Sequence, residues 1–321
     1  MCTGGVTGAT SGHATATDGH GIRCRDRQEW VDSFCPTVTT VLHDIHESRR
    51  DASAAGFGSA IASVRAGGRL LLGTLIAGQA AFVTYLLAGY GRSLLTGNVA
   101  AWARYSAAGW VPGDAMGNTA MATHLFVAVV VLTAGAVQLL PVVRRRWPVL
   151  HRWSGRLYLS ACLLGAVSGL WLVWGRGTVG DTAQHVAISI NALLLTGCAV
   201  MAWRHARARQ FTSHRVWAVR TVLVAGGVYY FRILLALWLL IHRGPVGFDA
   251  QRFSGPFLTV LAFTVYVFGP LTLFEGYRHA ERRAPGVARA VMTAVLWVVS
   301  LVTAAGAASA VLVLWLPKLR P

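Results

Sequence analysis

Long apolar stretches separated by short polar segments dominate the pattern of this chain. Seven of these stretches are long enough to cross a bilayer as helices, which requires about 20 apolar residues. We place them, to within a few residues at each end, at 70–90, 119–141, 152–174, 183–203, 216–241, 256–277 and 290–316. The pattern therefore predicts an all-α fold, a polytopic transmembrane helical bundle of about seven spans.

The first 67 residues follow a different pattern. They are rich in Gly, Ala, Ser and Thr and show no sustained periodicity, so we expect residues 1–67 to form a largely disordered tail. We assign residues 68–280 to a membrane domain of six spans. The remaining segment, 281–321, is expected to hold the last transmembrane helix and a short tail.

Composition and charge support a membrane protein and indicate its orientation. Hydrophobic residues make up 55% of the chain and charged residues 13%, about half the charged fraction of a soluble domain. The connections 142–156, 204–220 and 278–289 hold 14 basic residues, whereas the segments on the opposite side hold seven. By the positive-inside rule these connections and the N-terminus are cytoplasmic, and the C-terminus lies outside a bacterial inner (cytoplasmic) membrane.

The net charge of +17 does not indicate a nucleic-acid partner. Most basic residues lie between apolar runs, and no stretch alternates basic residues with exposed aromatic residues, as a nucleic-acid surface would. The expected partner is therefore the lipid bilayer.

Four histidines in the second to fifth spans follow a doubled pattern. His124 is followed, after a basic loop, by His151 at a spacing of 27 residues, and His185 by His214 at a spacing of 29 residues. In both copies an arginine follows the second histidine directly. This repeat predicts that a hairpin of two helices occurs twice and that the second to fifth spans form a four-helix core.

The expected depths of these histidines define two pairs. His124 and His185 are each expected about one turn from the outer end of their spans, and His151 and His214 at the inner ends, with the two levels about 20–25 Å apart. Imidazole is a strong ligand for haem iron. The pattern therefore predicts one b-type haem at each level and electron transfer across the membrane, with redox donor and acceptor unidentified.

Arginines close to these levels are candidates for haem propionates, because a guanidinium pairs bidentately with a carboxylate. At the inner level the candidates are Arg152, Arg156, Arg215 and Arg220.

Arg232 is the candidate nearer the outer level, and it lies deep in the fifth span. Its donors could be shared by Tyr229 and Tyr230, and its charge could be balanced by Asp181, by Asp249 or by a bound anion.

Two other classes of function remain open. In a transporter or small-molecule-binding protein, Arg232, His124 and His185 would line an outer-facing polar cavity. Internal duplication favours this class, but the pattern predicts no span that is broken at mid-depth. In a structural or assembly protein the histidines would bond neighbouring helices or lipid head groups. No hydrolytic or transferase motif is present, so an enzymatic role would be at most that of an oxidoreductase component.

Several sequence elements resemble a known family. They are the run Gly135-Ala136-Val137-Gln138-Leu139, the element His151-Arg152-Trp153-Ser154-Gly155-Arg156-Leu157-Tyr158, the element Ser213-His214-Arg215 and the run Gly244-Pro245-Val246-Gly247-Phe248. Over about residues 70–280 the chain resembles a bacterial multi-pass membrane family, domain of unknown function 2306, which implies a membrane location. The ligand layout is loosely similar to di-haem transmembrane cytochromes b, although His151 and His214 begin their helices instead of lying inside them.

Overall fold

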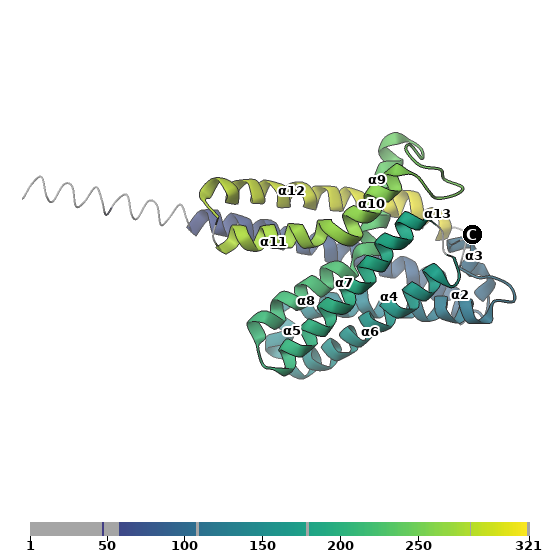
Figure 1. Ribbon diagram of the computed structural model, residues 1–321, viewed down its shortest axis with the longest axis horizontal. Coiled ribbons are helices and arrows are strands. Elements are labelled where there is room, and N and C mark those ends of the chain that lie inside the picture. The colour runs from purple at the N-terminus through teal and green to yellow at the C-terminus, as the bar shows by residue number, and fades with distance from the viewer. Residues whose placement is uncertain (1–46, 48–57, 107–108, 178–179, 283, 320–321) are drawn as a thin grey trace, which may run out of the picture. The chain divides into compact units, whose positions relative to one another are not determined.

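The computed structural model describes residues 47, 58–106, 109–177, 180–282 and 284–319. Within these residues the regular structure is helical, and the only β-type pairing described is an isolated bridge between Asp249 and Ser254. Residues Ser59–Pro321 form one compact unit. The predicted all-α helical bundle is therefore confirmed (Figure 1).

Six helices are long and apolar enough to cross a membrane, and a bent helix pair raises the number to seven. The candidates without a break are Gly58–Leu95, α4 (Ala115–Leu139), α6 (Pro148–Trp174), α7 (Thr182–Arg207), Pro256–Arg282 and Gly286–Leu319. The pair consists of α8 (Phe211–Ala225) and α9 (Gly227–His242).

Several shorter elements complete the chain. The first span ends in η1 (Leu87–Gly91) and α2 (Arg92–Leu95), and η2 (Val99–Ala101) and α3 (Trp102–Tyr105) follow it. The helix α5 (Pro141–Arg146) lies in the first basic loop. The span Pro256–Arg282 consists of α10 (Pro256–Phe263), η3 (Thr264–Phe268) and α11 (Gly269–Arg282). The last span consists of α12 (Gly286–Ser309), η4 (Ala310–Trp315) and α13 (Leu316–Leu319).

The first span begins earlier than expected. It extends at least to Gly58, so residues 58–67 are helical where the sequence pattern led us to expect a disordered tail. The reason is tertiary packing, because Val64 is fully buried against Ala280, Ala284 and Leu296. The rest of the expected tail, apart from Glu47, lies outside the described residues.

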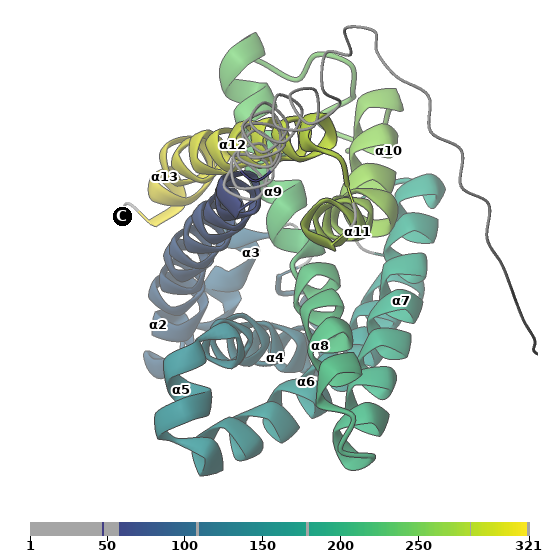
Figure 2. The same cartoon turned by 90° about the vertical axis from the view of Figure 1, so that its left-hand side faces the viewer.

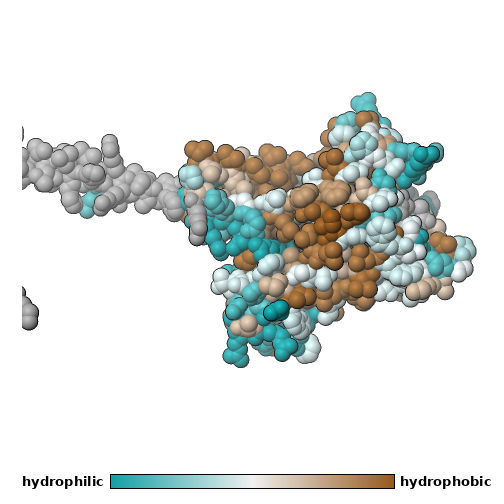
Figure 3. Space-filling view, viewed as in Figure 1, coloured by the Kyte–Doolittle hydropathy of each residue, from teal (hydrophilic) through white to brown (hydrophobic). Residues whose placement is uncertain are grey.

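The distribution of hydropathy over the surface agrees with a membrane-spanning unit. Figure 3 shows hydrophobic residues over the middle of the helices and hydrophilic residues toward both ends. The α5 region, the α7–α8 turn and the α11–α12 turn, which carry the basic connections, lie at the same end (Figure 1). We call this end the basic face.

The four-helix core differs from the prediction in its fourth member. Helix α4 packs along α6, α6 along α7, and α7 along α8, as the repeat predicts. However, the fifth span bends by 45° between Ala225 and Gly227, and α9 packs along α12 instead (Figure 2). The expectation of an unbroken fifth span was wrong, and only its inner half belongs to the four-helix core.

The bend occurs at two adjacent glycines, Gly226 and Gly227, the least favourable helix formers after proline. A Cβ atom at Gly227 would lie 2.7 Å from Cδ1 of Tyr266 and 3.3 Å from Nδ2 of Asn191. A side chain at Gly227 would therefore prevent α7 and η3 from packing closely at the bend. This close approach is decided by tertiary contacts, which the apolar pattern of the span does not reveal.

Candidate functional site

The inner histidines begin two alternate helices of the core, α6 and α8, which both pack along α7. His151 lies in the first turn of α6 and His214 in the first turn of α8. Nδ1 of His214 lies 2.9 Å from the carbonyl oxygen of Ala202 near the end of α7. A carbonyl can only accept, so Nδ1 carries the proton and Nε2 keeps its lone pair. This is the arrangement in which a metal-ligating histidine is usually held.

The structure places the two inner histidines at the same end of the core, because the α5–α6 corner and the α7–α8 turn both lie at the basic face (Figure 1). Nδ1 of His151 is buried and has no hydrogen-bond partner among the residues that the structure describes. The inner pair therefore combines a free lone pair on His214 with an unsatisfied nitrogen on His151.

Residues of the two family-like elements, 135–139 and 151–158, hold His151 in position. Nε2 of Gln138 donates to the carbonyl oxygen of His151 at 3.1 Å and to Oγ of Ser154 at 2.6 Å. A Cβ atom at Gly155 would lie 3.1 Å from Oε1 of Gln138, and one at Gly135 would lie 3.1 Å from Cε2 of Tyr158. The two elements thus join the end of α4 to the start of α6 through one amide and two close helix contacts.

The four arginines proposed for the inner level have different surroundings. Arg152 and Arg215 are exposed, and the guanidinium of Arg156 lies 4.8 Å from the centre of the Trp153 ring. Arg220 instead donates to Oε1 of Glu275 on α11, at 2.9 Å from Nε and 2.7 Å from NH2. Arg220 is therefore paired with a carboxylate of the protein itself, in place of the haem propionate predicted for it.

The outer histidines lie in different surroundings. Nδ1 of His124 lies 3.1 Å from Oγ of Ser168 on α6, and a Cβ atom at Gly169 would lie 3.3 Å from Cε1 of His124. The ring of His185 lies edge-to-face with Trp174, at 5.6 Å between ring centres. The side of α6 that His185 contacts is open, because Trp174 is 58% exposed.

The two outer histidines also lie at different positions along their helices. Both helices begin with an aspartate cap, Asp114 for α4 and Asp181 for α7. His124 is ten residues beyond its cap and His185 only four, a difference of about 9 Å along a helix axis. The expectation that both lie about one turn from the outer ends was wrong for His124, because α4 begins at Ala115, earlier than the apolar pattern indicates.

Arg232 has neither of the acidic partners considered for it. Asp181 accepts from the backbone nitrogen of Gln184 at 3.0 Å, and Asp249 accepts from the backbone nitrogens of Gln251 and Arg252 at 2.8 and 3.1 Å. The guanidinium of Arg232 lies 5.5 Å from the centre of the Phe82 ring. Within the described part of the chain it has no hydrogen bond or ion pair, so its charge is not balanced by a carboxylate.

Two polar residues with clear structural roles were not identified from the sequence. The side chain of Arg176 is 5% exposed, and its Nε lies 3.2 Å from Oδ2 of Asp114. The side-chain amide of Asn191 donates to backbone carbonyls on two other helices. The signal that could have revealed Asn191 is the amide itself, since polar residues inside spans are rare and have partners.

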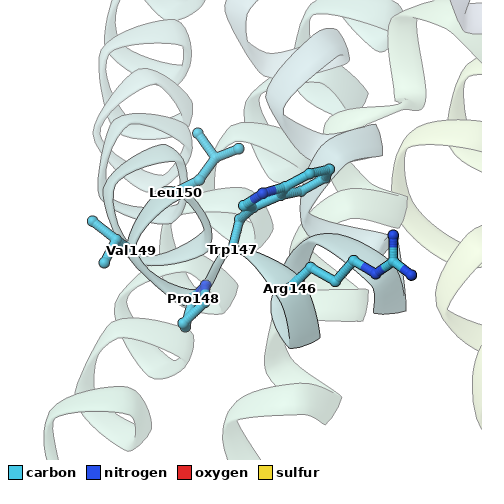
Figure 4. A pocket seen from close by; sticks show the side chains of 5 residues that line it. All are labelled: Arg146, Trp147, Pro148, Val149 and Leu150. Atoms are coloured by element: carbon cyan, nitrogen blue, oxygen red, sulfur yellow. The ribbon is translucent and has the colours of Figure 1, made fainter.

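A surface hollow near the basic face is separate from the four histidines. Five consecutive residues line it at the α5–α6 corner, and none is one of the four histidines: Arg146, Trp147, Pro148, Val149 and Leu150 (Figure 4). Trp147, Val149 and Leu150 are at least half exposed there, as expected for residues at a membrane interface. Among the described residues no group of three or more His, Cys, Asp or Glu side chains is placed to hold a metal ion.

Comparison with known proteins identifies a family. A family model described as "Predicted membrane protein (DUF2306)" matches residues 121–249, a narrower range than the resemblance over 70–280. The matched segment contains α5, α6, α7, α8 and α9, most of α4, and all four histidines of the repeat. No curated protein and no solved structure matches the chain. Over residues 121–249 this integral, multi-pass membrane protein is therefore similar to the predicted membrane proteins of the DUF2306 family.

Proposed function

We propose that this protein takes part in electron transfer at the membrane and holds a b-type haem between His151 and His214. The observation that carries this proposal is the contact between Nδ1 of His214 and the carbonyl oxygen of Ala202, from which the position of the proton follows. Because Nδ1 of His214 is bonded to the carbonyl of Ala202 at 2.9 Å, Nε2 is the atom left for iron.

The residues around His151 and His214 are compatible with a bound haem. The unsatisfied Nδ1 of His151 is a buried polar atom without a partner in the described residues, which is costly unless a ligand or a structural change satisfies it. The exposed Arg152 and Arg215 follow the two histidines directly and could pair with propionates. When bound, the haem would supply one-electron chemistry, and the residues of this chain would hold and orient it.

The outer pair gives weaker support for a second haem. Two imidazoles on one iron need nitrogens about 4 Å apart, because imidazole–metal bonds are about 2 Å long. His124 and His185 differ in their distances from the helix caps and contact different parts of α6. We therefore propose a single haem per chain, at the inner level.

The proposal is tested on protein purified in detergent from haem-replete cells. We expect a reducible Soret band, with about equimolar haem, that is lost in His151→Ala and in His214→Ala. His205→Ala is the matched control, because His205 is only half-buried on the same face and its ring bonds to Gln210 at 2.6 Å instead of pairing with another histidine. A folded but colourless wild-type protein, or a band that survives in both variants, would show that this pair does not bind haem.

A second candidate function is binding or transport of a small molecule. The observation that favours it is the 45° break in the fifth span, directly before the helix that carries Arg232. Broken helices often form substrate sites in transporters, because their ends leave backbone groups free. Uptake of labelled organic anions by proteoliposomes tests this function, and uptake equal to that of empty liposomes would contradict it.

A further inference from the structure

Arg232 carries a positive charge in the bilayer-spanning part of the protein and has no carboxylate partner among the described residues. The described residues 58–319 contain five acidic side chains, and all are engaged elsewhere. Three of them form ion pairs: Asp114 with Arg176, Glu275 with Arg220 and Arg278, and Glu281 with Arg65. The other two accept hydrogen bonds from backbone N–H groups, Asp181 at the start of α7 and Asp249 within its own loop. An unpaired charge at membrane depth is costly and indicates a function.

A second cation contacts the same aromatic cluster as Arg232. Lys318, in α13, donates from Nζ to the carbonyl oxygen of Tyr105 at 2.9 Å. The ring of Tyr105 lies 6.2 Å from that of Tyr85, which lies 6.3 Å from the Phe82 ring that Arg232 contacts. Two cations in one poorly hydrated cluster would attract an anion, because charges are weakly screened there.

Two buried hydrogen-bond donors without acceptors in the described residues belong to side chains that contact the ring of Phe82. Phe82 contacts the guanidinium of Arg232, the ring of Tyr229 at 6.2 Å and the ring of Trp315 at 5.1 Å between centres. Tyr229 is 1% exposed and Trp315 is 3% exposed. The Tyr229 hydroxyl and the Trp315 Nε1 are both buried without a partner in the described residues. We call Phe82, Tyr229, Arg232, Trp315 and Lys318 the Arg232 site.

The Arg232 site combines two cations, two unsatisfied donors and aromatic walls, with no carboxylate from the described residues. Unpaired buried donors are unfavourable unless an acceptor arrives, and guanidinium matches the two oxygens of a carboxylate. We propose that the Arg232 site binds the carboxylate of an organic acid with an apolar body, since Arg232, Tyr229 and Trp315 surround Phe82 and have no carboxylate partner in the described part of the chain. The acid could come from water or from the lipid phase. The site does not depend on haem at His151 and His214.

The test measures thermal unfolding of the full chain in detergent, with benzoate as the water-soluble acid, oleate as the lipid-derived acid and inorganic phosphate as an anion without an apolar body. We expect benzoate, oleate or both to raise Tm in a saturable way, because a ligand that binds only the folded state stabilises it. Phosphate should have a much smaller effect. Which of the two acids is effective distinguishes the aqueous source from the lipid source.

Arg232→Gln is the decisive variant. It removes an unbalanced charge, so Tm without ligand should stay the same or rise, while the shift caused by the acid disappears. Arg176→Gln is the matched control, because Arg176 is paired with Asp114. The control should lower Tm without ligand and keep the shift.

Two further variants remove single donors and keep the aromatic rings. Tyr229→Phe or Trp315→Phe should weaken binding of the effective acid about 10-fold, as expected for one hydrogen bond to a charged group. The proposal is overturned if neither acid shifts wild-type Tm, if phosphate is as effective, or if Arg232→Gln keeps the shift. It is also overturned if Arg232→Gln lowers Tm as much as Arg176→Gln. The Soret band of each preparation reports separately on the histidine pair.

Discussion

Nδ2 of Asn191 lies 2.8 Å from the carbonyl oxygen of Tyr266, and the same amide donates to the carbonyl oxygen of Val224 at 3.2 Å. Pro270 has no N–H for the Tyr266 carbonyl four residues before it. Val224 is the penultimate residue of α8, where carbonyls lose their partners within the helix. One side chain of α7 therefore satisfies carbonyls at the interruptions of two other spans.

Asn191→Leu should lower the free energy of unfolding by about 1–3 kcal/mol, because it leaves two buried carbonyls without this donor. Unfolding in mixed detergent with increasing SDS measures the change. Thr196→Val is the control on the same helix, because the Thr196 hydroxyl bonds only to the carbonyl of Ala192, at 2.8 Å, in the structure. Equal stability of Asn191→Leu and the wild type would show that these hydrogen bonds contribute nothing.

Gly227→Ala should destabilise the bend by about 1–3 kcal/mol, the usual cost of overpacking. The new methyl group would lie 2.7 Å from Cδ1 of Tyr266, so α7, α9 or η3 must shift. Gly197→Ala on α7 is the matched control, because nothing lies within 4 Å of its added Cβ. The control should stabilise by about 0.5–1 kcal/mol through helix propensity. The prediction fails if both substitutions have the same sign in SDS unfolding.

Asp114→Asn should cost about 3–5 kcal/mol, because it leaves the guanidinium of Arg176 without its charged partner. The side chain of Arg176 is 5% exposed and also donates to the carbonyl oxygen of Gly117 at 3.0 Å and to Oδ1 of Asn118 at 2.7 Å. Arg252→Gln is the comparison at an exposed ion pair. Arg252 lies 4.0 Å from Asp249 and its side chain is 84% exposed. This ion pair should contribute less than about 1 kcal/mol to the free energy of unfolding. Thermal unfolding of both variants gives the ranking, and a larger loss in Arg252→Gln would contradict it.

The loop around Asp249 should lose order in acid. Backbone N–H groups of Arg252 and Gln251 hold the pKa of the Asp249 carboxyl below its ordinary value of 3.8. A carboxyl whose pKa is lowered by folding stabilises the fold above its unfolded pKa, and this contribution is lost as pH falls through the folded pKa. The amides of Gln251 and Arg252 should therefore keep their protection from hydrogen exchange above pH 3.8 and lose it progressively below.

Asp249→Asn provides the control for this loop. The amide side chain does not titrate in this range, so protection of the two amides should not depend on pH once intrinsic exchange rates are corrected. If both the wild type and Asp249→Asn lost amide protection in acid to the same extent, a group other than the Asp249 carboxyl would be responsible.

The histidine repeat shows how much of the candidate site was predictable. The sequence correctly placed His151 and His214 at the starts of two core helices, because both positions are set by where apolar runs start. That the two side chains share one ligand stays a prediction. The depth of His124 was not predictable in the same way. The cap at Asp114 starts α4 several residues before the apolar run becomes evident, so His124 lies ten residues beyond its cap and not about one turn.

By itself the sequence determined the helical class, the spans and their approximate limits, the basic face and the duplicated hairpin. All of these depend on apolar length, charge and spacing along the chain. Only the tertiary structure decided the break at Gly226, the direction of α9 and the gathering of Arg232, Lys318, Tyr229 and Trp315. The physical reason is that helix rotation and bending depend on which carbonyls and side chains find partners on other helices, and those partners are distant in sequence.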